Sequence, residues 1–224
     1  MSNLLLHAIE SALSGSSSKP KVLVFDVNET LLDLAPLKKQ IAQALGDDKL
    51  VGEWFSTLLH YSLVHSLTQN YVPFGQIGAN ALMMISEREG QQIGAASALD
   101  LVETGLRQLE PYPDVASTLT HLKEAGFKLV TLTNSSSSAA KAKLAYAQIY
   151  DQFDQHYTVE PVKQFKPAPA AYQQVFDSLG IKADQAMMIA AHPWDLMGAR
   201  AVGMRTCFVR RPGKVSYPSR AREL

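Results

Sequence analysis

The stretch that decides the fold is Lys21–Asp33, with the sequence KVLVFDVNETLLD. Its first part, Val22–Phe25, is a short apolar run, which is typical of a parallel strand that is buried on both faces. An acid, Asp26, follows at the point where the apolar run ends. Ligands bind at the carboxyl ends of the strands in open α/β sheets, so this position predicts a functional carboxylate. An aspartate that only caps a helix or forms a turn is the alternative.

The bulk composition bounds the class of protein. The chain has 224 residues, 46% of them hydrophobic and 19% charged, which is enough for one large domain or for one domain with an insertion. Lysine plus arginine equals aspartate plus glutamate, 21 each, and gives no indication of a nucleic-acid or membrane surface. The single cysteine, Cys207, excludes a disulfide framework. No run is long enough to cross a membrane, and the start of the chain lacks a basic leader. We therefore expect a cytoplasmic protein with no nucleic-acid and no membrane partner.

The strand and helix patterns divide the chain into three parts. Residues 1–20 predict a short helix followed by a serine-rich joint. Between residues 35 and 109 the apolar residues recur at helical spacing, and glycines and prolines separate several helices. We interpret this region as a helical cap inserted after the first strand. Residues 21–34 and 110–224 alternate strands with helices, which predicts an α/β core.

Three further strands are predicted in the core, at residues 128–133, 186–191 and 206–209. Asp114 is expected to cap a helix that ends near Gly126. The tail after Arg210 has little periodicity, so we expect a loose surface segment there.

Polar residues follow three of the predicted strands, and a fourth polar position precedes a helix. Because successive strand ends of a right-handed doubly wound sheet open at the same edge, these side chains should share one cleft. Each alone has an ordinary explanation as a cap, a strand residue or a solvated loop residue, but together they indicate one site. The residues are Asp26, Thr30, Thr133, Asn134, Lys166 and Asp195.

This set of side chains favours nucleophilic displacement. Asp26 is the candidate nucleophile, since a carboxylate can form a covalent ester or an acyl-phosphate. Lys166 would keep it ionised, because an opposite charge lowers the pKa of a carboxylate. Thr30 would orient Asp26, and Asp195 would fix Lys166 or position the hydrolytic water. Donors on Thr133 would face an anionic group of the substrate.

Four motifs carry a family resemblance: Phe25-Asp26-x-x-x-Thr30-Leu31, Leu132-Thr133-Asn134, Lys166-Pro167 and Trp194-Asp195-x-x-Gly198-Ala199-Arg200. In order and spacing they resemble the motifs of the haloacid dehalogenase (HAD) superfamily, over Lys21 to about Arg211. The likeness looks closest to the type II, L-2-haloacid dehalogenase branch. Features that point there are Tyr71-Val72-x-Phe74, Asp154 to Pro161, Tyr172 and Trp194-Asp195.

The resemblance implies a Rossmann-like parallel sheet flanked by helices, with a helical cap inserted after the first strand. It also implies a homodimer and a small anionic substrate. Catalytic roles fall on Asp26, Thr30, Lys166 and Asp195. Substrate-binding roles fall on Val27, Asn28, Phe55, Thr133, Asn134, Tyr172, His192 and Trp194.

The residue two positions after Asp26 separates two chemistries. HAD phosphatases have an aspartate there as acid and base, whereas this chain has Asn28, which cannot protonate a leaving alcohol at neutral pH. Halide leaves without a proton. We therefore expect an aspartyl ester formed by displacing halide from a small 2-halo acid, with no metal and no cofactor. The alternative is a magnesium-dependent phosphatase that holds its metal through Asp26, Asn28 and Asp195, although hard cations prefer more oxygens than these supply.

Several positions depart from the dehalogenase pattern. The family usually has an aromatic residue at Asn28, and it has an arginine, which receives the halide, at Phe55. Loss of a fixed cation beside a departing anion removes electrostatic stabilisation. The family's serine and asparagine correspond to Ala190 and His192, and His192 is a candidate alternative base. These departures leave a third hypothesis, a HAD-fold binding protein whose catalysis has decayed. Candidates to replace the arginine are Asn28, His60, His65 and Trp194.

Overall fold

The computed structural model describes residues 3–14 and 19–218. Within them, parallel strands form one five-stranded sheet in the order β3-β2-β1-β4-β5, flanked by helices. This arrangement confirms the predicted α/β fold class. The strands are β1 (Val22–Phe25), β2 (Lys128–Thr133), β3 (Gln155–Thr158), β4 (Ala186–Ala190) and β5 (Arg205–Phe208).

Strand β1 lies at the centre of the sheet, between β2 and β4, and all of its residues are buried. Its last residue, Phe25, pairs with Thr131 on one side and Ile189 on the other. The backbone N–H of Asp26 still donates to Ile189 O at 3.0 Å. The acid therefore begins where the central ladder ends, at the edge where parallel sheets bind ligands.

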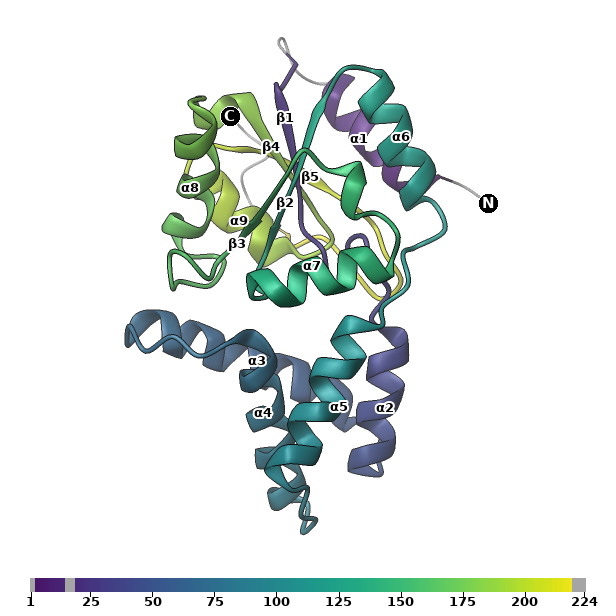
Figure 1. Cartoon of the computed structure of the whole chain (residues 1–224), viewed down its shortest axis with the longest axis vertical. Coiled ribbons are helices and arrows are strands. Elements are labelled where there is room, and N and C mark those ends of the chain that lie inside the picture. The colour runs from purple at the N-terminus through teal and green to yellow at the C-terminus, as the bar shows by residue number, and fades with distance from the viewer. Residues whose placement is uncertain (1–2, 15–18, 219–224) are drawn as a thin grey trace.

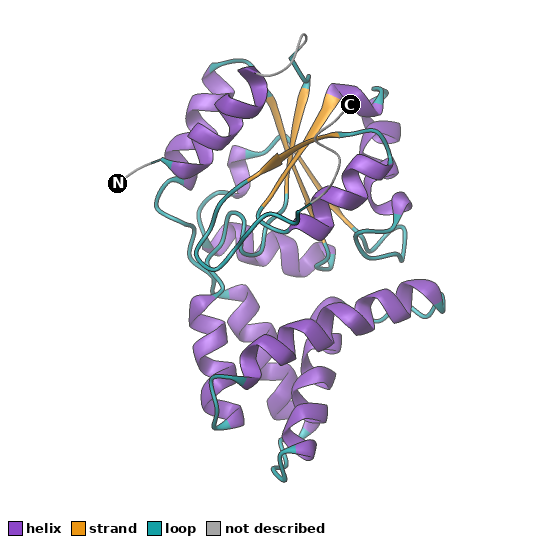
Figure 2. Cartoon of the chain, turned by 180° about the vertical axis from the view of Figure 1, so that it is seen from behind, coloured by secondary structure: helices purple, strands orange, loops and turns teal. Residues whose placement is uncertain are grey.

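Helices cover both sides of the sheet (Figures 1 and 2). Helices α1 (Leu4–Ser14) and α6 (Val115–Glu124) lie on one side, and α8 (Pro169–Leu179) and α9 (Pro193–Ala201) lie on the other. Helix α7 (Ser137–Tyr146) runs along the carboxyl ends of the strands, between the sheet and a second lobe (Figure 1). Two short 3-10 helices, η1 (Tyr150–Gln152) and η2 (Ala183–Gln185), lie in the loops.

The second lobe is entirely helical and lies below the carboxyl ends of the strands (Figure 1). Its helices are α2 (Ala35–Leu45), α3 (Leu50–Leu67), α4 (Phe74–Arg88) and α5 (Ala95–Arg107). Trp54 fixes α3 on α4, because its Nε1–H donates to Gly78 O at 2.9 Å. A Cβ at Gly78 would lie 2.8 Å from Leu58, so glycine permits this close contact. We call this lobe the cap and propose that it covers the site.

Strand β3 and the residue that precedes α6, Asp114, differ from the sequence predictions. The strand was not predicted, because Gln155–Thr158 lies at the sheet edge and lacks an apolar run. Asp114 precedes α6, as predicted, but its side chain makes no capping bond. Its carboxylate instead accepts from the Leu5 N–H at 2.9 Å and from Arg211 Nη1 at 2.8 Å. Asp114 therefore ties α1 and the tail to the core.

The prediction of a loose tail is wrong at its start. Arg211 is buried, and its Nε donates to Thr30 O at 3.0 Å. The guanidinium also lies 4.2 Å from the ring centroid of Tyr112. Of the predicted serine-rich joint, residues 15–18 lie outside the described residues. In the described part of the chain, no helix has the length and apolar character needed to cross a membrane.

Candidate active site

Asp26 lies at the carboxyl end of β1 and is held by three side chains. Thr30 Oγ1 donates to Oδ2 at 2.7 Å, Lys166 Nζ donates to Oδ1 at 2.8 Å, and His192 Nδ1 lies 3.2 Å from Oδ2. Burial alone would raise the pKa of Asp26. The opposing effects of Lys166 and His192 are larger, and they hold this pKa well below its usual range. The carboxylate is therefore ionised at neutral pH and fixed in orientation.

Lys166 joins Asp26 to a second buried acid, Asp195. Besides Asp26, its Nζ donates to Asp195 Oδ2 at 2.6 Å and to Leu132 O at 3.1 Å, so each ammonium proton has an acceptor. Burial favours the neutral amine, yet the charges of Asp195 and Asp26 raise the pKa of Lys166 above its usual value. The lysine therefore remains a fixed cation between two carboxylates.

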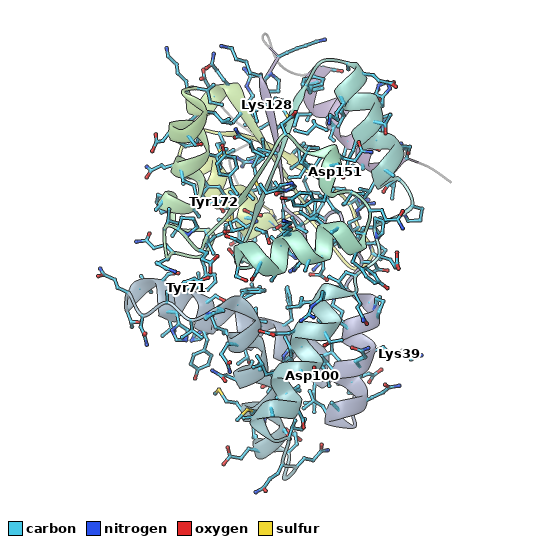
Figure 3. All side chains as sticks on the ribbon, viewed as in Figure 1. Lys39, Tyr71, Asp100, Lys128, Asp151 and Tyr172 are labelled. Carbon is cyan, nitrogen blue, oxygen red and sulfur yellow. The ribbon has the colours of Figure 1, made fainter. Side chains whose placement is uncertain are left out.

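Tyr172 holds Asp195 from the other side. Its hydroxyl lies 2.8 Å from Asp195 Oδ1, and Figure 3 shows Tyr172 in the core, away from the cap. Gly198 makes room for this contact, since a Cβ there would lie 2.6 Å from the Tyr172 hydroxyl and 2.5 Å from Pro167 Cβ. Asp195 is fully buried, and both of its carboxylate oxygens have partners. It lies behind Lys166 and does not face the cavity in front of Asp26.

The polar residues after β2 form another wall of the site. Asn134 Oδ1 accepts from the backbone N–H of Lys166 at 2.9 Å, which ties the lysine loop to the strand end. Thr133 Oγ1 accepts from the Ser135 N–H at 3.2 Å. Since its carbonyl oxygen is occupied, Asn134 has its amide N–H groups left for a ligand.

A small cavity of about 20 Å³ lies in front of Asp26, where the core meets the cap. A volume of this size holds about one water. The cap contributes only apolar side chains to its wall, namely Phe55, Leu59 and Phe74. The core contributes Asp26, Asn28, Thr133, Asn134, Lys166, His192 and Trp194. The structure thus brings most of the predicted site residues to one cavity.

The loop that carries Lys166 is held from the cap as well. The buried Phe165 donates its backbone N–H to Ser66 Oγ on α3 at 2.9 Å. Its ring stacks on Tyr71 with 5.3 Å between centroids, and Figure 3 places Tyr71 at the junction of cap and core. Phe74 packs against the Phe165 ring, with 6.0 Å between the two centroids. Cap and core therefore jointly position the lysine.

His192 connects Asp26 to a buried glutamate. Its Nε2 lies 2.9 Å from Glu29 Oε2, while its Nδ1 faces Asp26. Burial would lower the pKa of His192, but the hydrogen bonds to Asp26 and Glu29 raise it above its usual value. Glu29 also accepts from Lys38 Nζ and Lys214 Nζ, both at 2.5 Å. Burial would raise the pKa of Glu29, whereas His192 and Lys214 lower it to about 2.

A second buried cation, Lys143, lies behind Asn28. Its Nζ donates to Asn28 Oδ1 and to Ser135 Oγ, both at 2.9 Å, and the side chain is fully buried. Burial lowers the pKa of Lys143 to about 7, although the Asp26 charge opposes this shift. Because its oxygen faces Lys143, the amide nitrogen of Asn28 points away from the lysine.

Six of the predicted or candidate residues lie outside the cavity wall, namely Thr30, Asp195, Val27, Tyr172, His60 and His65. Val27 is fully buried, and its carbonyl accepts from the Leu31 N–H at 2.9 Å. Tyr172 is buried in the core, where its hydroxyl donates to Asp195 Oδ1. His60 and His65 lie on α3 but do not line the cavity, and His65 Nδ1 bonds Asn70 O at 2.6 Å. They therefore do not replace the missing arginine in this structure.

Sequence reasoning missed four charged residues: Glu29, Lys38, Lys143 and Lys214. Lys143 had a usable signal, because it shares one helical face with the buried Ala140, Leu144 and Ala147. A lysine on such an apolar stripe is a candidate buried cation. The other three are brought together only by tertiary structure.

The donor set expected for magnesium does not fit a hard cation here. The oxygens of Asp26 and Asp195 already face Lys166, His192 or a hydroxyl, and Asn28 Oδ1 faces Lys143. A divalent cation would lie beside these protonated groups, which repel it. Among the described residues, no group of three or more His, Cys, Asp or Glu side chains is arranged to hold a metal.

A comparison with protein-family models identifies the family of this chain. The model of the haloacid dehalogenase-like hydrolases matches residues 20–203. The chain belongs to the haloacid dehalogenase-like hydrolase family. This confirms the superfamily predicted from the four strand-end motifs, and with it the assignment to the hydrolases.

Several named members of the family are similar to this chain. The (S)-2-haloacid dehalogenase of Pseudomonas sp. (strain YL) is 30% identical over 197 residues, covering 87% of this chain and 84% of that protein. Haloacetate dehalogenase H-2 of Moraxella sp. (strain B) is 28% identical over 199 residues, covering 87% and 88%. A structure of L-2-haloacid dehalogenase from Xanthobacter autotrophicus with covalently bound chloropropionic acid has a TM-score of 0.77 and 26% identity, and the match covers 84% of this chain and 76% of that chain.

Proposed function

We propose that this hydrolase displaces halide from small 2-halo carboxylic acids and releases 2-hydroxy acids. The observation that carries the proposal is an ionised Asp26 that is oriented by Thr30, Lys166 and His192 and faces a small cavity closed by apolar side chains of the cap. The similar proteins named 2-haloacid dehalogenases, one with chloropropionic acid covalently bound, support this chemistry.

The hydrogen bonds of Asp26 select the attacking oxygen. Thr30 donates to Oδ2, and His192 also faces Oδ2, whereas within the described residues only Lys166 bonds Oδ1. Oδ1 therefore keeps a lone pair for attack. It forms a bond to the halogen-bearing carbon as the carbon–halogen bond breaks, and the halide leaves with the electron pair. The product of this step is an ester on Asp26.

Substrate size and orientation follow from the cavity wall. Thr133 and the Asn134 amide would bind the substrate carboxylate, while Phe55 and Trp194 would pack on its carbon chain. A 2-halo acid is larger than a cavity of about 20 Å³, so side chains at the junction of cap and core must move to admit it. The wall of aromatic residues restricts the site to short substrates and keeps water away from the displacement.

The departing halide needs an electrostatic partner because Phe55 replaces the family's arginine. Asn28 lines the cavity, and Lys143 holds its carbonyl oxygen at 2.9 Å. The amide N–H groups then point away from Lys143, and we propose that they receive the halide. In its protonated form, Lys143 adds a positive charge next to the amide and strengthens the amide N–H groups as donors.

The two other hypotheses lack a supporting observation of this kind. A magnesium-dependent phosphatase needs an acid at Asn28 and free carboxylate oxygens, and the site offers neither. A decayed binding protein is not expected to keep Lys166 bonded to both Asp26 and Asp195. Cofactor independence, a homodimer and a cytoplasmic location stay predictions from sequence.

Halide release from a panel of chloro-, bromo- and fluoro-acids tests the proposal. The wild-type protein should release halide and 2-hydroxy acid in equal amounts, with and without EDTA. Asp26→Asn should be inactive, and Asp177→Asn, on the exposed face of α8, is the matched control. Turnover in heavy-oxygen water should place label in Asp26. A folded wild-type protein that releases no halide, or EDTA-sensitive turnover of an aryl phosphate, would overturn the proposal.

A further inference from the structure

Glu29 occupies a backbone conformation that glutamate rarely adopts. Its φ is +59°, in the left-handed region that favours glycine, and its side chain is only 3% exposed. Strain of this kind persists where the surrounding contacts enforce it, and it is common at functional sites. Here those contacts are His192, Lys38 and Lys214, which all bond the Glu29 carboxylate.

His192 is held between that carboxylate and the candidate nucleophile. One ring nitrogen, Nε2, faces Glu29 Oε2 at 2.9 Å, and the other, Nδ1, faces Asp26 Oδ2 at 3.2 Å. The ring also packs against Phe55, with centroids 6.1 Å apart, and against Trp194, at 5.2 Å. A carboxylate that orients an imidazole toward a reacting group is the arrangement of a general base and its orienting acid.

We propose that His192, oriented by Glu29, is the general base that activates water to hydrolyse the Asp26 ester. The proposal rests on the proposed function, because it concerns the second half of that reaction. His192 would be a catalytic residue, and Glu29 a positioning residue that acts through it.

The other groups near Asp26 are unsuited to this role. Asp195 is fully buried, and its two oxygens accept from Lys166 and Tyr172. Lys166 donates to Asp26, Asp195 and Leu132 O and has no lone pair to accept a proton. The Thr30 hydroxyl donates to Asp26 and accepts from the Ala191 N–H at 2.9 Å. His192 is the remaining proton acceptor among the described side chains that bond Asp26.

The proton transfers balance over the second half-reaction. Formation of the ester removes the negative charge of Asp26, so His192 loses its proton to solvent and presents the Nδ1 lone pair. Nδ1 then takes a proton from water as the water oxygen bonds Cγ of the ester. The tetrahedral intermediate breaks the bond between Cγ and Oδ1, which stays on the substrate carbon, and His192 returns the proton to that oxygen, giving the 2-hydroxy acid. The second water proton passes to His192 as the Asp26 carboxylate re-forms.

The charged groups around the ring allow this cycle. Glu29 faces Nε2 and stabilises the imidazolium that forms during water attack. Lys214 Nζ, from the C-terminal tail, lies 3.4 Å from Nε2, and Lys38, on α2, faces the opposite oxygen of Glu29. These two lysines hold the Glu29 carboxylate in place. Side chains of the loop after β1, the cap and the tail thus converge on one imidazole.

The test separates formation of the ester from its hydrolysis. With a haloacid that wild type turns over, His192→Asn should release about one halide per protein and then stop, and intact-mass measurement should show the ester on Asp26. Steady turnover should fall on the order of 100-fold or more. His121→Asn, an exposed change on α6, is the control and should behave as wild type. Glu29→Gln, which keeps the side-chain size, should preserve the halide burst and slow ester hydrolysis on the order of 10-fold or more.

Each outcome separates this proposal from the proposed function. Absence of halide release by wild type would overturn the proposed function. Wild-type turnover with unchanged turnover in folded His192→Asn would overturn only the base assignment. Loss of the halide burst in both folded variants would also overturn it, because the pair would then serve the first step. If His192→Asn fails to fold, Glu29→Gln decides, since an unchanged rate of ester hydrolysis excludes the pair.

Discussion

The two sides of Asp26 are built differently. The Lys166 side (Lys166, Asp195 and Tyr172) is fully buried in the core, and each of its polar groups is paired with another core group. The His192 side (His192, Glu29, Lys38 and Lys214) combines a core loop with the cap and the tail. Its two lysine side chains are 37% and 17% exposed. The Lys166 side is closed to solvent, whereas the two lysines of the His192 side are partly exposed to it.

This difference corresponds to two chemical tasks. A closed ion pair keeps the nucleophile charged without changing its own protonation, because Lys166 is held by two carboxylates. Removal of a proton from the attacking water needs a group that can gain a proton and then lose it to solvent. The His192 side supplies such a group, the imidazole of His192.

Removal of the central cation should have the largest effect. In Lys166→Met, Asp26 and Asp195 remain buried beside each other without a counter-charge. Breaking a buried ion pair in this way costs about 3–5 kcal/mol of folding free energy. Halide release should fall about 100- to 1000-fold, because the nucleophile loses its fixed charge partner. Urea unfolding and a halide electrode measure the two effects.

The matched control is Lys182→Met, which removes an exposed lysine from the loop before η2. It should change neither quantity. If Lys166→Met kept halide release within about tenfold of wild type, the Lys166 side would not be what activates Asp26.

The second prediction concerns the buried Lys143 behind Asn28. Burial lowers its pKa from 10.5 to about 7, so between these values the unfolded chain binds more protons than the folded chain. Stability is therefore lost as the pH falls from about 10 toward about 7. Relative to Lys143→Met, wild type should lose about 2–3 kcal/mol of unfolding free energy between pH 9 and pH 7.

Lys141→Met changes an exposed lysine on the same helix and should show no such pH dependence. If Lys143 also strengthens the halide-binding amide, Lys143→Met should slow halide release as well. A stability difference that does not change with pH would contradict a buried lysine of lowered pKa.

Much of the Lys166 side was predictable from sequence, because its residues lie where patterns end. A buried apolar strand that stops at Asp26, a second that stops at Thr133 and a loop before a helix at Lys166 all place polar groups at one sheet edge. Parallel topology then brings them together. The polar edge strand Gln155–Thr158 escaped prediction because pairing with β2, not an apolar pattern, makes it a strand.

The His192 side was less predictable, for two physical reasons. Nothing in the local sequence shows that Glu29 adopts a φ of +59° and turns its carboxylate inward. Lys214 meets Glu29 from a tail that has no periodicity, and a contact between residues so far apart in sequence leaves no local pattern. His192 was recognised as a candidate base only because it departs from the family's asparagine.

Gly198 offers a smaller perturbation of the Lys166 side. A methyl group there would clash with Pro167 and the Tyr172 hydroxyl, so Gly198→Ala should separate Tyr172 from Asp195. Overpacking of this kind costs about 2 kcal/mol. Gly52→Ala is the matched control, because Gly52 lies inside α3 with nothing within 4 Å of the added Cβ. It should stabilise the protein by about 0.5–1 kcal/mol, so thermal melts that shift the same way would refute the close contact.

The smallest expected effect tests whether the cap supports the Lys166 side from outside the core. Ser66 Oγ accepts from the buried Phe165 N–H at 2.9 Å, next to Lys166. Ser66→Ala leaves that donor unpaired and should cost about 1 kcal/mol. Ser56→Ala, on the exposed face of the same helix, should be neutral. Because the lost bond also loosens the lysine loop, halide release should fall modestly in Ser66→Ala. Equal behaviour of the two serine variants would mean that the core alone positions Lys166.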